Sequence, residues 1–389
     1  GQDLVYAGAV IQALKLKRHL IQQLRVYLMV EEAVHLDVIA HADDRHALPC
    51  REHQRVQTDT DDGFHAGQNA DGGFDWLADA KEKFRSLMPE DKVFYVNLFP
   101  QPCSYESLYG ENYDSNAVNY ETNYVDVFLR KVQPEQLSVD YYPLMEGNLI
   151  RPSYYQNLET LAYRAKDNDI PLEVTVQNSG HDTTDGRYVS PSVQQLRWQM
   201  AVAMTYGAST LDHYIFTSHE ETYASMVDFN TLKPTELFEN AKTVDLELRA
   251  WEDIYCSYRW LGSGKVDTAE SNMMLLRLTK SLPQDQWGVL SNIESDGDVI
   301  FGIFENAYGE NAYMITNAGS TTEIPGKDYL ANFEINNANV CLQFNVENCH
   351  YLKVISGGES EFVKQSADGT FQFTIPAYDG VFVIPLIEN

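Results

Sequence analysis

Long hydrophobic runs are missing from this chain of 389 residues. No stretch of about 18 consecutive apolar residues is present, which is the length that a helix needs to cross a bilayer. The first residues also lack a basic stretch followed by an apolar one, the pattern of an export signal. We therefore expect no membrane-spanning segment and no export signal in this sequence.

Cysteine and basic residues are both scarce. The five cysteines are odd in number and have no CxxC spacing, which disfavours a disulfide framework and a cysteine-based zinc site. Lys and Arg together number 28 against 57 Asp and Glu, which gives a formal net charge of −29. Because nucleic-acid affinity comes mainly from cationic side chains that neutralise phosphates, we expect no nucleic-acid partner. A neutral or cationic ligand fits this charge better.

Tyrosine, in contrast, is abundant, with 24 copies. Its ring offers a flat apolar face and a hydroxyl, which together suit the recognition of sugar rings, although tyrosines also fill protein cores. Only two of the tyrosines, but six of the ten histidines, lie within residues 1–73. This break in composition indicates an atypical N-terminal segment before the regular part of the chain begins at Phe74.

From Phe74 onward, short apolar stretches alternate with amphipathic ones. The expected strands cover residues 92–99, 136–141, 172–177 and 210–216, and the expected helices cover residues 74–88, 120–132, 154–168, 192–206 and 238–249. Apolar strands that are each followed by a helix predict parallel β structure covered by helices. After Gly264 the pattern changes to short alternating segments separated by turn sequences such as SDGD and SGGES. It predicts a β-sandwich over residues 264–389, behind an α/β domain over residues 74–263.

Polar and aromatic residues follow every expected strand. Since ligands of parallel α/β proteins bind beyond the C-terminal ends of the strands, these residues form the candidate site. Tyrosine rings there would stack on a sugar, and amide and imidazole groups would hydrogen-bond its hydroxyls. Core packing and loop capping are the alternatives. The candidate substrate-binding residues are Asn97, Tyr141, Tyr142, Gln177, His181 and Tyr214.

Acidic residues at two strand ends are candidates for catalysis. Hydrolysis of a glycosidic bond normally uses two carboxyl groups, one of which protonates the leaving oxygen. Asp140 is the first candidate because it stands at a strand end beside two tyrosines, and Glu220 and Glu221 are the second. A structural aspartate and solvated loop acids are the alternative interpretations.

Several segments together carry a family resemblance. They are FDWLADAKEKF, FYVNLFP, LSVDYYPL, YYQNLETLAYRA, VTVQNSGH, LRWQMAVAMTYGAS and HYIF. In this order they resemble the barrel of uncharacterised bacterial glycoside hydrolase-like proteins, which are distantly similar to clan A β-galactosidases. The resemblance covers residues 74–389 and implies strands five to eight of a TIM (β/α) barrel, followed by a β-sandwich. It implies a carbohydrate substrate and cleavage of O-glycosidic bonds by carboxylate acid/base chemistry, with no metal and no organic cofactor.

Two departures from that family pattern concern the acids themselves. The family's Asp-Glu-Pro motif does not precede the FDWL segment, and the nearest upstream acids are Glu31 and Glu32. Gln177 stands where the family's nucleophilic glutamate would end the seventh strand, and an amide cannot be that nucleophile. The alternative function is therefore a non-catalytic carbohydrate-binding or degenerate barrel protein.

The N-terminal segment is also short for the first half of a barrel. Only 91 residues precede Lys92, whereas a complete barrel of about 250 residues needs more for its first four units. A truncated or replaced half-barrel would leave strand edges uncovered, so we expect a homo-oligomer.

The stretch HADDRH at residues 41–46 faintly resembles a zinc-deacetylase motif, but a solvated loop is the better interpretation. Enzymes that act on polymeric sugars are commonly exported, and a secreted or periplasmic location is compatible with the charge.

Overall fold

The computed structural model describes residues 72–89, 92–110, 113–183, 186–218, 222–268 and 272–387, together with the short strands β1 (Val26–Tyr27) and β2 (Gln57–Thr58). The chain divides into two units. Unit 1 comprises Gly1–Asn97 and Ser104–Gln136, and unit 2 comprises Leu98–Cys103 and Leu137–Asn389. In the described part of the chain, no helix is both long and apolar enough to cross a membrane.

Unit 1 is mainly helical in its described part. Its helices are α3 (Gly73–Leu87), α4 (Tyr105–Tyr109), a π-helical turn (Tyr120–Val125) and α5 (Asp126–Val132). Phe74 of α3 packs against Tyr124 and Phe128, with ring centroids 5.2 and 5.3 Å apart. The predicted helices over residues 74–88 and 120–132 are thus confirmed, apart from the π-helical first turn of the second.

The strand predicted over residues 92–99 is reduced to β3 (Asn97–Leu98). The prediction rested on an apolar run, and Phe94, Tyr95 and Val96 are indeed buried. An apolar run reports burial, however, and burial alone does not distinguish a paired strand from a buried extended segment.

A parallel sheet forms the centre of unit 2. Its strands β4 (Leu137–Asp140), β7 (Leu172–Gln177) and β10 (Thr210–Tyr214) are parallel, in the order β10-β7-β4-β3. All six residues of β7 are buried, as expected of a strand covered on both faces. The predicted parallel arrangement is confirmed for β4, β7 and β10, and the eight-stranded barrel stays a prediction.

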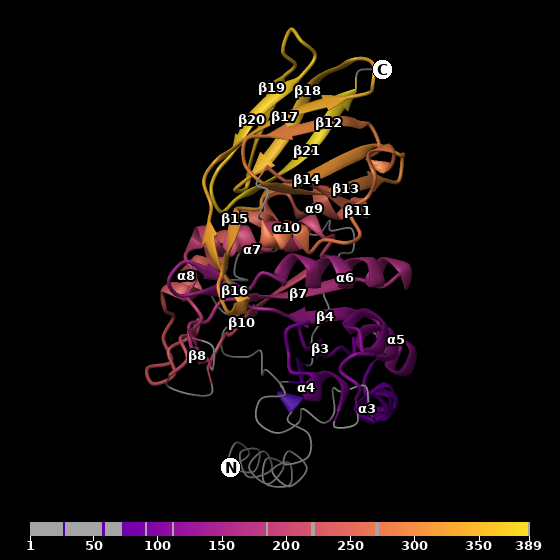
Figure 1. The fold of residues 1–389 in the computed structure, drawn as a ribbon, viewed down its shortest axis with the longest axis vertical. Coiled ribbons are helices and arrows are strands. Elements are labelled where there is room, and N and C mark those ends of the chain that lie inside the picture. Colours follow the sequence, from indigo (N-terminus) through magenta and orange to yellow (C-terminus); the bar gives the residue numbers. More distant parts are fainter. Residues whose placement is uncertain are drawn as a thin grey trace, which may run out of the picture. The chain divides into compact units, whose positions relative to one another are not determined.

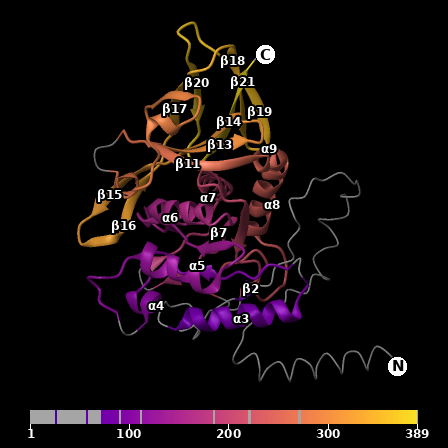
Figure 2. The same cartoon turned by 90° about the vertical axis from the view of Figure 1, so that its right-hand side faces the viewer.

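Helices pack on this sheet and separate it from the C-terminal strands. They are α6 (Tyr154–Asp167), α7 (Val193–Thr205) and α8 (Glu236–Arg249). The α7 helix begins with a capping box formed by Ser192 and Gln195, which satisfies its first free N–H groups. It contacts β7 on one side and the C-terminal strands on the other, and Figures 1 and 2 both show α6 and α7 between these layers.

The C-terminal region consists of two antiparallel sheets that share one core. One sheet has the order β11 (Tyr258–Val266), β13 (Val299–Asn306), β14 (Asn311–Asn317), β21 (Gly380–Ile387), β18 (Cys349–Ser356) and β19 (Glu359–Lys364). The other has the order β12 (Leu290–Ser295), β17 (Ala338–Phe344) and β20 (Phe371–Ile375). Phe301 and Ile315 from the first sheet and Val340 and Phe371 from the second belong to the shared core. The predicted antiparallel sandwich is confirmed, and its first strand begins before Ser263.

A hairpin extends from the sandwich to the loop that follows β4. Its strands β15 (Ser320–Ile324) and β16 (Lys327–Glu334) continue through β6 (Leu149–Ile150) to β5 (Leu144–Met145) in one four-stranded sheet. Figures 1 and 2 both show the hairpin extending below the sandwich to the height of α7 and β7. The loop after β4 is therefore paired to the hairpin that follows β14.

The remaining short elements are β8 (Asp182–Thr183), β9 (Gly186–Arg187), α9 (Glu252–Cys256), α10 (Met273–Leu276) and a 3-10 turn (Gln284–Gln286).

Candidate functional site

Five aromatic rings meet beyond the C-terminal ends of β4, β7 and β10. Tyr142, which follows β4, stacks on Tyr214 at the end of β10, with centroids 5.2 Å apart and planes 25° apart. His181, which follows β7, stacks on Tyr223 at 4.2 Å and 15°. Tyr188 lies 5.7 Å from Tyr142 and 4.9 Å from His181. We call these five residues the strand-end cluster; its four tyrosines are partly exposed and its histidine is buried.

Backbone hydrogen bonds tie together the loops that carry these rings. The N–H of Tyr188 donates to the carbonyl of His181 at 2.9 Å, and the N–H of Asn178 donates to the carbonyl of Tyr214 at 2.6 Å. Gly180 allows the loops to approach closely, because a Cβ there would lie 2.3 Å from the hydroxyl oxygen and 2.9 Å from the backbone nitrogen of Ser190. The cluster is thus held by its backbone as well as by ring contacts.

Charged groups border the cluster. Asp140, the last residue of β4, is partly buried, and the hydroxyl of Tyr142 makes a long contact of 3.4 Å with its carboxylate. The guanidinium of Arg151 lies over the ring of Tyr188, 5.3 Å from its centroid. Burial raises the pKa of the Cys103 thiol to about 12; the charge of Asp140 adds to the rise and that of Arg151 opposes it. This thiol is protonated near neutral pH and is a poor nucleophile.

Two of the predicted substrate-binding residues make their hydrogen bonds within the protein interior instead. Tyr141 is 2% exposed, its hydroxyl contacts that of Ser153 at 2.6 Å, and burial raises its pKa. It is therefore a core residue, which is the alternative interpretation given for these residues. Gln177 is 1% exposed, and its amide group is hydrogen-bonded to the backbone of Leu144 and Val189. The predicted contact of that amide with sugar hydroxyls has no support in this arrangement.

The other predicted site residues have different outcomes. Tyr142, His181, Tyr214 and Asp140 come together at the strand ends, as the strand-end rule predicts. Asn97 is the first residue of β3 and falls in unit 1. Glu220 and Glu221 lie outside the described residues, as do residues 41–46 with the alternative zinc motif.

Three members of the site were missed from the sequence. Tyr188, Tyr223 and Arg151 lie further along the loops than the residues that directly follow each strand. The available signal was their chemistry, because each is an aromatic or cationic residue within a loop that follows a predicted strand. In the described part of the chain, no group of three or more His, Cys, Asp or Glu residues is arranged to hold a metal ion.

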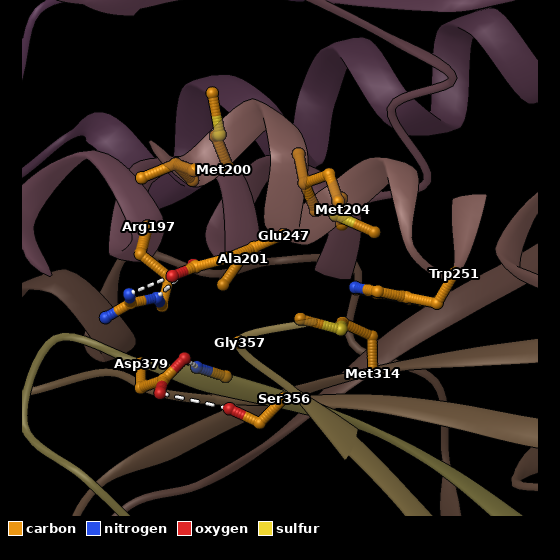
Figure 3. Close-up of a pocket in the computed structure, with 13 residues that line it drawn as sticks. Arg197, Met200, Ala201, Met204, Glu247, Trp251, Met314, Ser356, Gly357 and Asp379 are labelled. Carbon is orange, nitrogen blue, oxygen red and sulfur yellow. Dashed lines mark hydrogen bonds and ion pairs between the residues drawn. The ribbon is translucent and has the colours of Figure 1, made fainter. Parts of the chain in front are cut away.

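A small hollow lies elsewhere in unit 2, between α7, α8 and the sandwich (Figure 3). Arg197 and Glu247 form a bidentate ion pair at 2.8 and 2.7 Å, and the carboxylate of Asp379 accepts a hydrogen bond from Ser356 at 3.1 Å. A water-sized sphere can occupy ≈ 20 Å³ of it, which is room for about one water molecule. The hollow is a packing seam rather than a ligand pocket.

Comparisons with known proteins give weak structural likenesses. No family model and no curated protein sequence matches the chain. It is similar to a GH51 arabinofuranosidase from Xanthomonas axonopodis pv. citri, with 10% identity over 80% of this chain and 63% of that one and a TM-score of 0.36. It is also similar to a β-galactosidase from Halorubrum lacusprofundi, with 11% identity over 80% of this chain and 66% of that one and a TM-score of 0.36. A third similar structure is a GH27 β-L-arabinopyranosidase from Geobacillus stearothermophilus, with 8% identity over 88% of this chain and 84% of that one and a TM-score of 0.28. The chain spans less than two thirds of the first two structures, and likenesses at these TM-scores assign neither family nor activity.

Proposed function

We propose that this protein binds carbohydrate at the strand-end cluster. The observation that carries the proposal is the meeting of five rings from the ends of three neighbouring parallel strands and the loops after them. Partly exposed tyrosines offer apolar faces to the C–H surface of a sugar and hydroxyls to its polar rim. Asp140 and Arg151 beside the rings add an acceptor and donors of the kind that sugar hydroxyls require.

Binding is tested by calorimetry with neutral hexasaccharides of glucose, xylose, mannose, galactose and arabinose. We expect at least one to bind wild type, and Tyr142→Ala and Tyr214→Ala each to weaken that affinity by about tenfold. Tyr308→Ala is the matched control, because Tyr308 is 90% exposed on a turn of the sandwich and lies outside the cluster. The proposal fails if wild type binds none of the panel, or if both cluster variants bind as tightly as wild type.

Hydrolysis of an O-glycosidic bond is the second candidate function. The position of Asp140 favours it, since a partly buried carboxyl beside the binding rings is placed to donate a proton to a leaving oxygen. Glu220 and Glu221 remain the candidates for the second carboxyl, which must lie about 5 to 9.5 Å from the first.

The hydrolysis proposal requires the carboxyl group of Asp140 to donate a proton to the leaving oxygen. We expect Asp140→Asn to reduce the hydrolysis of aryl glycosides and of the bound hexasaccharide by about a hundredfold or more. Sugar affinity should change far less, because asparagine keeps the size and an acceptor oxygen. Equal activity of wild type and variant would remove Asp140 from the reaction, and a wild type that binds but never cleaves would leave binding as the function.

A further inference from the structure

The side-chain amide of Gln177 joins two loops of the strand-end cluster. Its Oε1 accepts from the N–H of Leu144 at 2.9 Å, and its Nε2 donates to the carbonyls of Leu144 and Val189, each at 2.9 Å. The amide thus pairs with both polar backbone groups of Leu144 while it holds a second segment. Both amide protons and one oxygen lone pair are used in this way.

Gln177 is itself held in place through its backbone. Its backbone N–H donates to Oε1 of Gln199 at 2.9 Å, and its backbone carbonyl accepts from Nε2 of Gln199 at 3.1 Å. Gln199 belongs to α7 and is fully buried. In addition, Gln177 is paired in register with Tyr214 across β7 and β10. A helix and a neighbouring strand therefore fix the position from which the amide reaches the loops.

The two loops are those that carry Tyr142 and Tyr188. Tyr142 precedes Leu144 by two residues, and Tyr188 immediately precedes Val189. The rings of the two tyrosines meet edge to face at 5.7 Å. Their separation depends on how closely the backbones beside them approach. The N–H of Val189 donates directly to the carbonyl of Leu144 at 3.3 Å, and the amide of Gln177 adds hydrogen bonds to both residues.

We infer that Gln177 is a positioning residue of the carbohydrate site: it sets the relative placement of the Tyr142 and Tyr188 rings without contacting the sugar. The inference rests on the proposed function, because the rings it positions are those of the proposed site. Its role explains the chemistry of the position. A carboxylate has no N–H donor, so glutamate here would direct negative charge at the carbonyl oxygens of Leu144 and Val189.

The test compares Gln177→Glu with Gln177→Met, two side chains of nearly the same length as glutamine. At pH 8 we expect both to weaken binding of the hexasaccharide that wild type binds by about tenfold or more. Lowering the pH to 5 should reduce the difference in hexasaccharide affinity between Gln177→Glu and wild type. A buried carboxyl facing two carbonyl oxygens protonates readily and regains an O–H donor. Gln177→Met has no such group and should show no recovery.

A control separates positioning from general destabilisation. Val354→Ala truncates a buried residue of the sandwich core, away from the site, and should keep wild-type affinity while lowering the denaturation midpoint. If Gln177→Glu does not fold, Gln177→Met carries the test. Unchanged affinity in the folded Gln177 variants would overturn the inference while leaving the proposed function intact.

A ligand-free measurement covers the case in which wild type binds no glycan of the panel. His181 lies between Tyr223 and Tyr188, at 4.2 and 4.9 Å, so their ring currents shift its imidazole proton resonances. These resonances can be assigned by comparison with His181→Gln. We expect them to move in the folded Gln177 variants at constant pH and to stay unmoved in Val354→Ala. Resonances that keep their wild-type positions in the Gln177 variants would refute the positioning role whatever the ligand.

Discussion

The indole nitrogen of Trp198 on α7 donates a hydrogen bond of 2.9 Å to the backbone carbonyl of Asn317 at the end of β14. Trp198 is fully buried, so this bond joins the helical layer and the sandwich away from water. We expect Trp198→Phe to lower the free energy of unfolding by about 1–2 kcal/mol through the lost bond, and Trp198→Ala by about 3–5 kcal/mol through the cavity. Urea denaturation measures both, and a Trp198→Phe variant as stable as wild type would show that the hydrogen bond contributes nothing.

The Asp379 carboxyl makes stability depend on pH. Burial is the main cause that raises its pKa in the folded protein, while hydrogen bonds and the nearby Arg197 oppose the rise and Glu247 adds to it. The folded state therefore binds this proton more readily than the unfolded state. Its contribution to stability is complete below the unfolded pKa and is lost as the pH rises through the folded pKa. Asp379→Asn should be more stable than wild type at pH values above the folded pKa of Asp379 and lose this advantage at pH values below the unfolded pKa. Denaturation at several pH values would show this. A constant difference would argue against a raised pKa.

Gly180 is predicted to be intolerant of any side chain. The added methyl group of Gly180→Ala would meet the backbone nitrogen of Ser190, so the loops must separate at a cost of about 1–3 kcal/mol. We expect sugar affinity to fall as well, because these loops carry His181 and Tyr188. Gly309→Ala is the control: its φ of +81° makes alanine cost about 1 kcal/mol, but no atom lies near the new methyl group. Should both variants bind sugar equally well, the close approach at Gly180 would have no bearing on the site.

The thiol of Cys103 reports on its neighbour Asp140. Because its pKa is raised to about 12, we expect Cys103 to alkylate with iodoacetamide at pH 8 far more slowly than the exposed Cys256. Since the charge of Asp140 contributes to the rise, Asp140→Asn should accelerate labelling of Cys103 but not of Cys256. Peptide mass spectrometry resolves the two sites. An unchanged rate at Cys103 would place the carboxylate too far away to matter.

The sequence predicted regular elements well where burial and periodicity agree. The strand Leu172–Gln177 has its expected bounds, because three apolar residues alternate there with polar ones directly after Pro171, which is the period of a strand. Residues 92–99 contain a more apolar run, but only Asn97–Leu98 form a strand. Strand pairing depends on a neighbour that is distant in sequence, and local composition does not contain that information.

The candidate site shows a similar division. The strand-end rule located Tyr142, His181 and Tyr214, since topology alone brings the ends of parallel strands together. It could not separate Tyr142 from its buried neighbour Tyr141, because adjacent residues of an extended segment point in opposite directions and only the packing decides which is covered. The use of the Gln177 amide by Leu144 is likewise a contact between separate loops, which no local pattern encodes.

The hairpin formed by β15 and β16 makes the sandwich a structural part of the site's support. It pairs with β6, and β6 pairs with β5, the strand held by Gln177. A chain cut after Ser263 would remove this hairpin and leave β6 with an unpaired edge in the segment that follows Tyr142. The sandwich therefore cannot be exchanged as an independent module: evolution or engineering that replaces it must rebuild the support of the ring cluster at the same time.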